Sequence, residues 1–523
     1  MAITFLNGRR REIVMRVALL FVVLALAGCV EESAPEPEAE PETQAVEPTR
    51  YDSMRMDFDL GTRPIQGSQG VYLLDIRGEQ TLPEGDGPFP VAMLMHGRHG
   101  TCSVTGPEVL LQPCPTTPVT ASVESYRGYR LLADSLASFG IAVFSIDANN
   151  VNDRDNDWGI AGDDYGATAR ARLVFEVLED LASGDAFAPI RDQLDLDTVG
   201  LMGHSRGGEG VIRAAVLQPD RFSAIMALAP TDFARWRMPD VPFATILPYC
   251  DGDVSNLQGA WAYDDMNDAP KHQFLHMGAN HNWYNTVWYQ NDWGNRGDPY
   301  CDMDGEQSGR LSPEEQEAQG AELMAAFFRY YLSDAPDLWP LLEGTELWDF
   351  DVKVSSESAV PAYPNTYFDL RFPHDMTWWP EHNRATVSTC DGLDCPIPRT
   401  FSTAKQAHIS FDAGGYANWR FDGPGQVQAD ASSLRIGLSP DATPQQLAGI
   451  HVVFRDEDGN KARYDLADHG LFVPPGDGAA KTTLNMVWLN HDADLAWDRI
   501  TSWGIGSDQA VELQVAEWVV RDA

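Results

Sequence analysis

The sequence has few basic residues. It contains 37 Lys and Arg against 78 Asp and Glu, which gives a formal net charge of −41 at pH 7, and only five of the basic residues are lysine. A surface this acidic repels a phosphate backbone. We therefore expect no nucleic-acid partner.

The sequence also lacks the ligand spacings of a metal site. None of its seven cysteines forms a C-x-x-C pair, and its 12 histidines form no cluster at zinc-ligand spacing. Two acidic loops, 152–164 and 298–315, miss the residue pattern of a calcium loop, so solvated acidic loops are the simpler interpretation. We expect neither a metal nor a cofactor.

The N-terminal apolar run is too short to span a bilayer comfortably. It covers 12 residues, 17–28, and follows four arginines, an order typical of a secretory signal. The run ends in "LAGC", which resembles a bacterial lipoprotein box. The resemblance implies that residues 1–28 are a signal peptide and that Cys29 is lipidated; an ordinary signal peptide is the alternative. Val30 favours the outer membrane, with the protein on its periplasmic or surface face.

The segment 29–50 is rich in Glu and Pro and has no apolar period, so we predict a disordered tether. Six further cysteines then lie in an oxidising compartment. Six cysteines can pair in 15 ways, and the sequence alone does not choose among them. The simplest arrangement pairs them in chain order, and the six are Cys102, Cys114, Cys250, Cys301, Cys390 and Cys395.

The length of 523 residues and a hydrophobic content of 43% predict two or three domains. Between residues 51 and 346, apolar strands such as "FPVAMLMHG" alternate with helical segments such as "GATARARLVFEVLEDLAS". This alternation predicts an α/β domain with a doubly wound, mostly parallel sheet. Residues 347–523 contain short strand-like runs between turn residues, which predict an antiparallel β-sandwich.

The stretch "VGLMGHSRGGEG" contains a G-x-S-x-G motif, with Ser205 between Gly203 and Gly207. A strand ending in this motif and followed by a helix is typical of a nucleophile elbow. The flanking residues must be small because their side chains would collide in so tight a turn. We therefore predict that Ser205 is a catalytic nucleophile.

A serine nucleophile needs a base, and the base needs an orienting acid. "FATILPYCDGDV" ends a strand with Asp251 and Asp253, and we prefer Asp253 because it lies deeper in the turn. The base is predicted to be His281, which follows the next strand. His276 is the alternative, but its mid-strand position is more typical of a packed core histidine.

The oxyanion of such a reaction needs two backbone N–H donors. One is expected from Arg206, directly after the nucleophile. The other is expected from the loop "HGRHG" after the strand "VAMLM", at Arg98 or alternatively at His99.

The residues "HGRHG", "GHSRGG", "YCDGD" and "GANHNW" together resemble an α/β-hydrolase serine esterase of the lidless group near chlorophyllases, platelet-activating-factor acetylhydrolases and cutinases. The resemblance covers a little under half of the chain. It implies hydrolysis of carboxylic esters through an acyl-enzyme, without a cofactor, on a small-molecule, lipid or polymer substrate. The aromatic-rich segment after His281 is longer than this group predicts.

The C-terminal half contains the runs "SSLRIGL", "HVVFRDEDGNKARYDL", "TTLNMVWL" and "RITSWGI". On these runs it resembles the galactose-binding-like jelly rolls of carbohydrate-binding modules. The likeness makes a glycan the candidate ligand of this domain, and a packing role is the alternative. For the whole protein, a peptidase or acylase with the same triad and a non-catalytic surface glycan-binding protein are the alternative functions. The peptidases that carry a jelly roll would have a helical insertion before the acid, and the 48 residues between Ser205 and Asp253 leave no room for one.

Overall fold

The computed structural model describes residues 50–104, 108–109, 114, 120–265, 269–288, 290–293, 298–357, 381–397, 401–425, 431–439, 441–473, 475, 481, 483–491 and 494–521. The predicted signal peptide, Cys29 and the predicted tether up to residue 49 lie outside these residues. Residues 49–523 group into one compact unit. Among the helices described, none is both long enough and apolar enough to cross a membrane.

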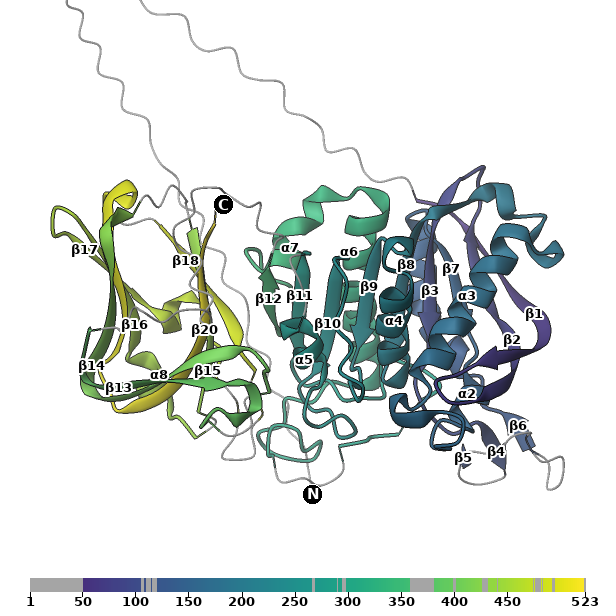
Figure 1. The fold of residues 1–523 in the computed structure, drawn as a ribbon, viewed down its shortest axis with the longest axis horizontal. Coiled ribbons are helices and arrows are strands. Elements are labelled where there is room, and N and C mark those ends of the chain that lie inside the picture. Colours follow the sequence, from purple (N-terminus) through teal and green to yellow (C-terminus); the bar gives the residue numbers. More distant parts are fainter. Residues whose placement is uncertain are drawn as a thin grey trace, which may run out of the picture. The chain divides into compact units, whose positions relative to one another are not determined.

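The first large sheet is mostly parallel (Figure 1). Its six parallel strands lie between an antiparallel pair at one edge and a single antiparallel strand at the other. In spatial order the strands are β1 (Ser53–Gln66), β2 (Val71–Pro83), β7 (Ala142–Ile146), β3 (Phe89–Met95), β8 (Leu194–His204), β9 (Ala224–Leu228), β10 (Phe243–Pro248), β11 (Lys271–His276) and β12 (Val352–Glu357).

Helices cover both faces of this sheet. Residues of α3, α4 and α5 pack in one apolar cluster with the strands, and residues of α1, α6 and α7 pack in another. The helices are α1 (Arg130–Ser138), α2 (Asn149–Asn152), α3 (Ala167–Ser183), α4 (Arg206–Leu217), α5 (Gly259–Asp264), α6 (Pro313–Ser333) and α7 (Trp339–Glu343). The doubly covered sheet explains why its parallel strands are almost continuously apolar.

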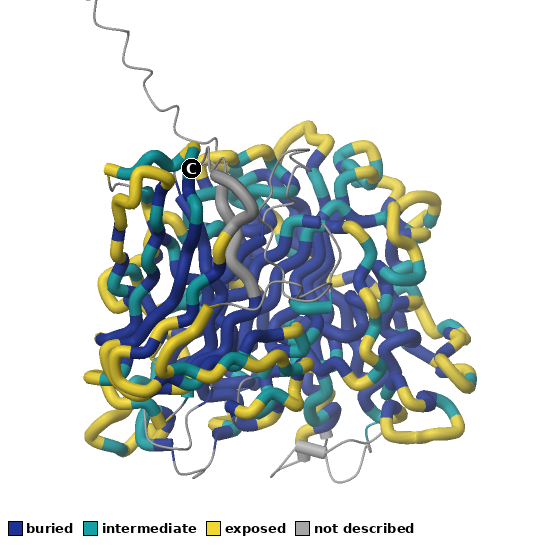
Figure 2. The backbone as a smooth tube through the Cα atoms, turned by 60° about the vertical axis from the view of Figure 1, so that its left-hand side comes forward, coloured by how far each residue is buried: buried dark blue, intermediate teal, exposed yellow. Residues whose placement is uncertain are grey.

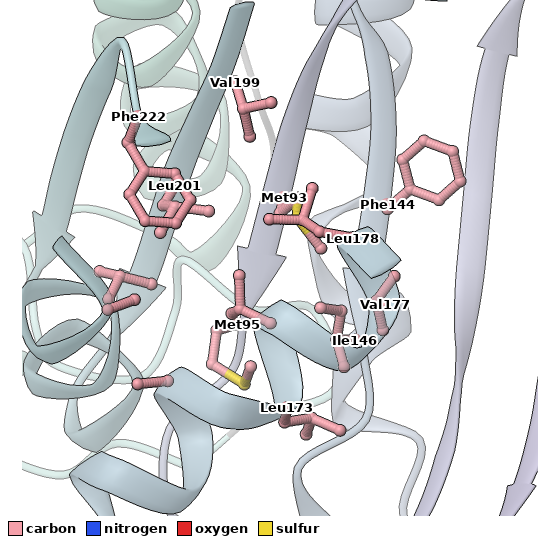
Figure 3. Packing of buried hydrophobic residues seen from close by; sticks show 14 of the residues in the cluster. Met93, Met95, Phe144, Ile146, Leu173, Val177, Leu178, Val199, Leu201 and Phe222 are labelled. Carbon is pink, nitrogen blue, oxygen red and sulfur yellow. The ribbon is translucent and has the colours of Figure 1, made fainter. Parts of the chain in front are cut away.

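Burial is concentrated along these strands, whereas exposed positions gather in the peripheral loops (Figure 2). Figure 3 shows the packing on one face, where strand residues such as Met93, Met95 and Ile146 lie near Leu173 and Val177 of α3. All five side chains are at most 1% exposed. The sheet is therefore a rigid platform for the loops at its ends.

The second large sheet is antiparallel throughout. Its inner face buries an apolar cluster in which Trp419 and Trp503 stack at 4.6 Å between ring centroids. Its strands are β13 (Glu381–Asp391), β14 (Lys405–Gly425), β15 (Ala431–Leu438), β16 (Ile450–Asp456), β17 (Lys461–Asp465), β18 (Asn485–Asn490), β19 (Ile500–Ser507) and β20 (Val511–Arg521), and α8 (Pro444–Ala448) precedes β16. The expected fold class, an α/β sheet plus an antiparallel β-sandwich, is confirmed.

The structure corrects the expected boundary at residues 346 and 347. Strand β12 pairs with β11 in the first sheet, so that sheet continues to Glu357. No local pattern indicates this extension, because β12 is antiparallel and its residues alternate as those of the second domain do.

The cysteines pair in chain order, as the simplest arrangement had it. The bridges are Cys102–Cys114, Cys250–Cys301 and Cys390–Cys395. The first closes a loop beside the small sheet of β4 (Cys102–Val104), β5 (Glu108–Val109) and β6 (Thr120–Ser122).

Candidate active site

Ser205 lies at a tight reversal between β8 and α4. Its backbone has φ 57° and ψ −124°, a conformation that side-chain-bearing residues rarely adopt. A Cβ on Gly203 would lie 2.1 Å from the carbonyl oxygen of Gly207, and one on Gly207 would lie 2.5 Å from the carbonyl oxygen of Met95. Glycine is therefore required on both flanks, because any side chain would overlap the backbone.

Parallel strands bring their carboxyl ends to one edge of the sheet, and four loops meet there. The loop after β3 passes so close to the serine that a Cβ on Gly97 would lie 2.5 Å from Ser205 Cβ. The next residue is Arg98, and Arg206 begins α4. Both candidate oxyanion donors therefore belong to segments that touch or follow Ser205. The alternative donor, His99, has its ring stacked on Trp288 at 4.8 Å.

A buried carboxylate–imidazole pair lies at the ends of β10 and β11. Nδ1–H of His281 donates to Oδ2 of Asp251 across 2.9 Å, and both residues are 1% exposed. Oδ1 of Asp251 accepts the backbone N–H groups of Asp253 and Val254 at 2.9 and 2.7 Å. These bonds turn the Asp251 carboxylate inward and fix its orientation.

This geometry corrects the choice of Asp253 as the orienting acid. The Asp253 side chain is 66% exposed, and its Oδ2 lies 3.7 Å from Nε2 of His281, on the ring edge opposite Asp251. The turn places the first aspartate of "DGD" against the histidine, because the second is carried outward beyond Gly252. The sequence shows both aspartates, but it does not indicate which of them the turn directs towards His281.

The two histidines of the β11 region have different surroundings. His276 is fully buried and bonds to the Tyr284 hydroxyl and to Oε1 of Gln319, each at 2.8 Å. Burial lowers its pKa to about 4. His276 is thus a packed core histidine, as its mid-strand position indicated.

The residue before the serine links the elbow to the histidine loop. Nε2–H of His204 donates to the backbone carbonyl of His281 across 2.9 Å, and the Tyr129 hydroxyl bonds to Nδ1 at 3.0 Å. Burial holds the pKa of His204 well below its usual value, and the nearby His281 lowers it further. His204 is therefore neutral. Its hydrogen bond to the His281 carbonyl ties the residue next to Ser205 to the loop that carries His281.

Two further charged groups, which the sequence did not single out, hold the acid loop. Asp292 accepts the backbone N–H of Gly252 at 2.6 Å and that of His281 at 3.1 Å, so one carboxylate clamps both loops. Nζ of Lys481 donates to the backbone carbonyl of Asp251 at 2.5 Å. Asp292 lies in the unexpectedly long segment after His281, and Lys481 lies in the C-terminal half.

The bridge Cys250–Cys301 adds a covalent restraint to this arrangement. Cys250 directly precedes Asp251, and its backbone N–H bonds to the Ala279 carbonyl at 2.8 Å. Crosslinks of this kind contribute about 2–4 kcal/mol to stability. The loop carrying the acid is therefore fixed by a disulfide as well as by hydrogen bonds.

A pocket of about 160 Å³ opens beside Ser205. Its other lining residues are Arg98, Arg206, Thr231, Phe233, Asp253, Val254 and Gln258. In the part of the chain that the structure describes, no group of three or more His, Cys, Asp or Glu side chains is arranged to hold a metal ion.

One of the two acidic loops differs from the solvated loop that was expected. Asp155, in the loop 152–164, is fully buried and pairs with Arg98, Arg170 and Arg206. No local sequence pattern indicates this cluster, because its members are dispersed between residues 98 and 206.

Known proteins match the part of the chain that contains this geometry. Residues 117–291 match the family model described as PETase, PET hydrolase-like. The chain therefore contains an α/β-hydrolase domain. The expected family resemblance is confirmed, and the matched range includes Ser205, Asp251 and His281.

Three individual relatives match stretches of this chain that are 124 to 170 residues long. Cutinase est2 of Thermobifida alba is 29% identical over 170 residues, 31% of this chain and 52% of the relative. Cutinase 2 of Thermobifida cellulosilytica is 29% identical over 161 residues, 27% of this chain and 56% of the relative. Bis(hydroxyethyl) terephthalate hydrolase of Streptomyces coelicolor is 32% identical over 124 residues, 24% of this chain and 34% of the relative. The chain thus spans about half the length of the two cutinases.

The electrostatics of His281 yield a first prediction. Burial by itself would lower the pKa of His281, but the Asp251 carboxylate, reinforced by Asp253 and Asp292, raises it to about 9. We expect an imidazole resonance in NMR titration with a midpoint near that value. Asp251→Asn should move the midpoint down towards or below the ordinary 6.5, because the largest opposing charge is lost while burial persists.

Asp253→Asn is the matched control, since it removes an exposed carboxylate from the same ring. It should lower the midpoint by less than Asp251→Asn does. A larger shift from Asp253→Asn would mean that the partners of His281 are assigned in the wrong order.

Proposed function

We propose that this protein is a serine esterase that hydrolyses carboxylic esters through an acyl-enzyme, with Ser205, His281 and Asp251 as its triad. The observation that carries the proposal is the buried Asp251–His281 pair, tied through His204 to a strained serine elbow. Each member follows a different strand of one sheet, so the sheet sets their spacing.

In the first half-reaction, Ser205 Oγ attacks the ester carbonyl and Nε2 of His281 takes the hydroxyl proton. Nε2 is free to accept because Nδ1 carries the ring proton that bonds to Asp251. The tetrahedral oxyanion is held by the backbone N–H groups of Arg206 and Arg98. Its collapse expels the alcohol, which leaves with the proton from His281.

In the second half-reaction, water attacks the acyl-serine while His281 removes its proton. Collapse of the second tetrahedral intermediate releases the carboxylic acid and returns the proton to Ser205. Asp251 stays ionised throughout and stabilises the imidazolium, because the pKa of its carboxyl stays below the usual value. Burial would raise that pKa, but His281 and Lys481 outweigh the effect.

The named activities of the relatives support an ester substrate. Two are called cutinases and one a bis(hydroxyethyl) terephthalate hydrolase, so polymer-derived esters are part of the proposed range. Between Ser205 and Asp251 the chain forms only α4, the short 3-10 turn Pro219–Arg221, β9 and β10. The helical insertion expected of the peptidase alternative has no place there.

The triad predicts a graded set of losses in the hydrolysis of 4-nitrophenyl acetate. Ser205→Ala should reduce kcat by roughly 10⁴-fold or more. Asp251→Asn should reduce it by roughly 10²–10⁴-fold, because the imidazole loses its orienting partner. Asp253→Asn should keep the larger part of the activity, and circular dichroism should show that all three variants remain folded.

The same assay should depend on pH in one direction. His281 must be neutral to accept the serine proton, so its raised pKa predicts that kcat/KM climbs as the pH rises towards about 9. Full activity in Ser205→Ala would overturn the proposed function. Cleavage of a matched 4-nitroanilide faster than the ester would favour the peptidase alternative.

We further propose that the protein is exported and lipid-anchored at Cys29, on the periplasmic or surface face of the outer membrane. The proposal is supported by the order of the N-terminal charges, the apolar run and the lipoprotein-like "LAGC". The Glu/Pro-rich segment that follows would keep the enzyme clear of the lipid surface.

Replacing the anchored residue tests this directly. With Cys29→Ser expressed in a Gram-negative host, the protein should leave the outer-membrane fraction, since the thiol that takes the lipid is missing. Val30→Ala, next to it, should stay in that fraction. Equal membrane association of Cys29→Ser and the parent chain would refute the anchor.

We also propose glycan binding by the C-terminal sandwich. A groove of about 490 Å³ runs over β14, β16 and β19, lined by Asn418, Arg455, Thr501 and other polar residues. Tyr416, 45% exposed, adds an aromatic ring to its wall. A flat apolar ring beside hydrogen-bonding side chains suits a sugar ring, which has one apolar face and a polar edge.

Affinity electrophoresis through a panel of soluble polysaccharides checks this. At least one polysaccharide should retard the parent protein, and Tyr416→Ala should lose at least most of that retardation. Leu393→Ala, which alters a similarly exposed side chain elsewhere in the sandwich, should behave as the parent does. Unchanged mobility of the parent across the panel would leave the groove with a packing role.

A further inference from the structure

Two arginines line the pocket beside the proposed nucleophile, although the protein as a whole is strongly acidic. Arg98 and Arg206 are two of the eight residues that line it. The chain as a whole carries a net charge of −41 and has about one basic residue for every two acidic ones. Cationic side chains at this position therefore stand out from the surface around them.

The arginines belong to a cluster with surplus positive charge. Asp155 accepts Nε–H of Arg98 at 3.0 Å, and its other oxygen accepts donors from Arg170 at 3.0 Å and Arg206 at 2.7 Å. Three guanidinium groups thus share one carboxylate, an excess of two positive charges. The burial of Asp155 and Arg170 keeps water from screening these charges as it does at the surface.

Arg206 is held in place as a wall of the pocket. Its guanidinium lies over the rings of Tyr165 and Phe233, at 5.2 and 5.6 Å from their centroids. It also donates to Oδ1 of Asn156 at 3.2 Å. With its side chain fixed in this way, Arg206 needs no reordering to meet an anion.

Arg98 retains unused hydrogen-bond donors. Within the described residues, its bond to Asp155 uses Nε and leaves the two terminal nitrogens of the guanidinium without a hydrogen-bond partner. The side chain is 30% exposed. A free pair of terminal nitrogens matches the two oxygens of a carboxylate.

One negative group faces the same pocket. Asp253 lines it, but its side chain is 66% exposed, so water screens its charge more strongly than that of the buried cluster. Among the residues that line the pocket, two arginines face this one aspartate, which leaves one positive charge in excess. The pocket therefore favours an anion even with Asp253 ionised.

The pocket adjoins the proposed oxyanion site, because it is lined by Ser205 and by both residues whose N–H groups are the proposed oxyanion donors. Asp253, whose carboxylate lies 3.7 Å from Nε2 of His281, lines it as well. We propose that this pocket binds an acyl group ending in a free carboxylate, so that the preferred substrates are monoesters of dicarboxylic acids. The inference rests on the proposed esterase function and adds its substrate class.

A matched pair of substrates tests the proposal. The 4-nitrophenyl monoester of adipic acid and 4-nitrophenyl hexanoate have acyl chains of equal length, and only the first ends in a carboxylate. The parent enzyme should show a kcat/KM for the adipate at least about tenfold above that for the hexanoate, with the rate of Ser205→Ala subtracted as background. Raising the ionic strength should shrink this ratio.

Arg98→Gln should lower the adipate-to-hexanoate ratio by about tenfold, because it removes the free guanidinium and keeps a polar side chain. Arg172→Gln is the control, since it removes one exposed positive charge from α3, the helix that also carries Arg170. It should leave the ratio unchanged. Circular dichroism of both variants would confirm that each is folded.

The outcomes separate this inference from the proposed function. Ser205-dependent cleavage of both esters with a ratio near one would overturn the carboxylate pocket and leave the esterase intact. Equal losses on both substrates in Arg98→Gln would assign the arginine to holding the loop, and would also overturn the pocket. Absence of Ser205-dependent cleavage of either ester would overturn the esterase itself.

Discussion

The backbone reverses at Ser205 in a space that admits no side chain on either flank. Gly203 and Gly207 approach so closely that a Cβ on Gly203 would lie 2.1 Å from the Gly207 carbonyl oxygen. This crowding drives Ser205 to positive φ and sets its hydroxyl at the carboxyl edge of the sheet, beside the loop of Gly97. Every other feature of the site is placed relative to that turn.

Two aspartates next to His281 differ in the groups that they contact. Asp251 and Asp292 both lie beside His281, yet they have different tasks. Asp251 meets the ring, whereas Asp292 accepts backbone N–H groups from both loops. Burial raises the pKa of Asp292, and the Asp251 charge raises it further. The arrangement keeps one carboxylate for the imidazole and uses the other to hold the loops in register.

The local signals in the sequence were strong where a single segment determined the structure. The strand–turn–helix around Ser205 and the capped helix α6, with Ser312 bonded to the Glu315 backbone, both follow from neighbouring residues. The strands of the C-terminal sandwich could be predicted from the turn residues between them. Strand β12 could not be predicted, because its place at the edge of the first sheet depends on pairing with β11, roughly 80 residues earlier.

The sequence by itself determined the nucleophile motif, the two candidate aspartates and the candidate base. Only the tertiary structure decided between Asp251 and Asp253, because a turn of a few residues fixes which carboxylate points inward and which meets water. It alone assembled Asp155 with its three arginines and brought Lys481 to the acid loop. The physical reason is common to all of these: contacts between distant segments depend on how the sheet and its loops pack, and no local pattern encodes that packing.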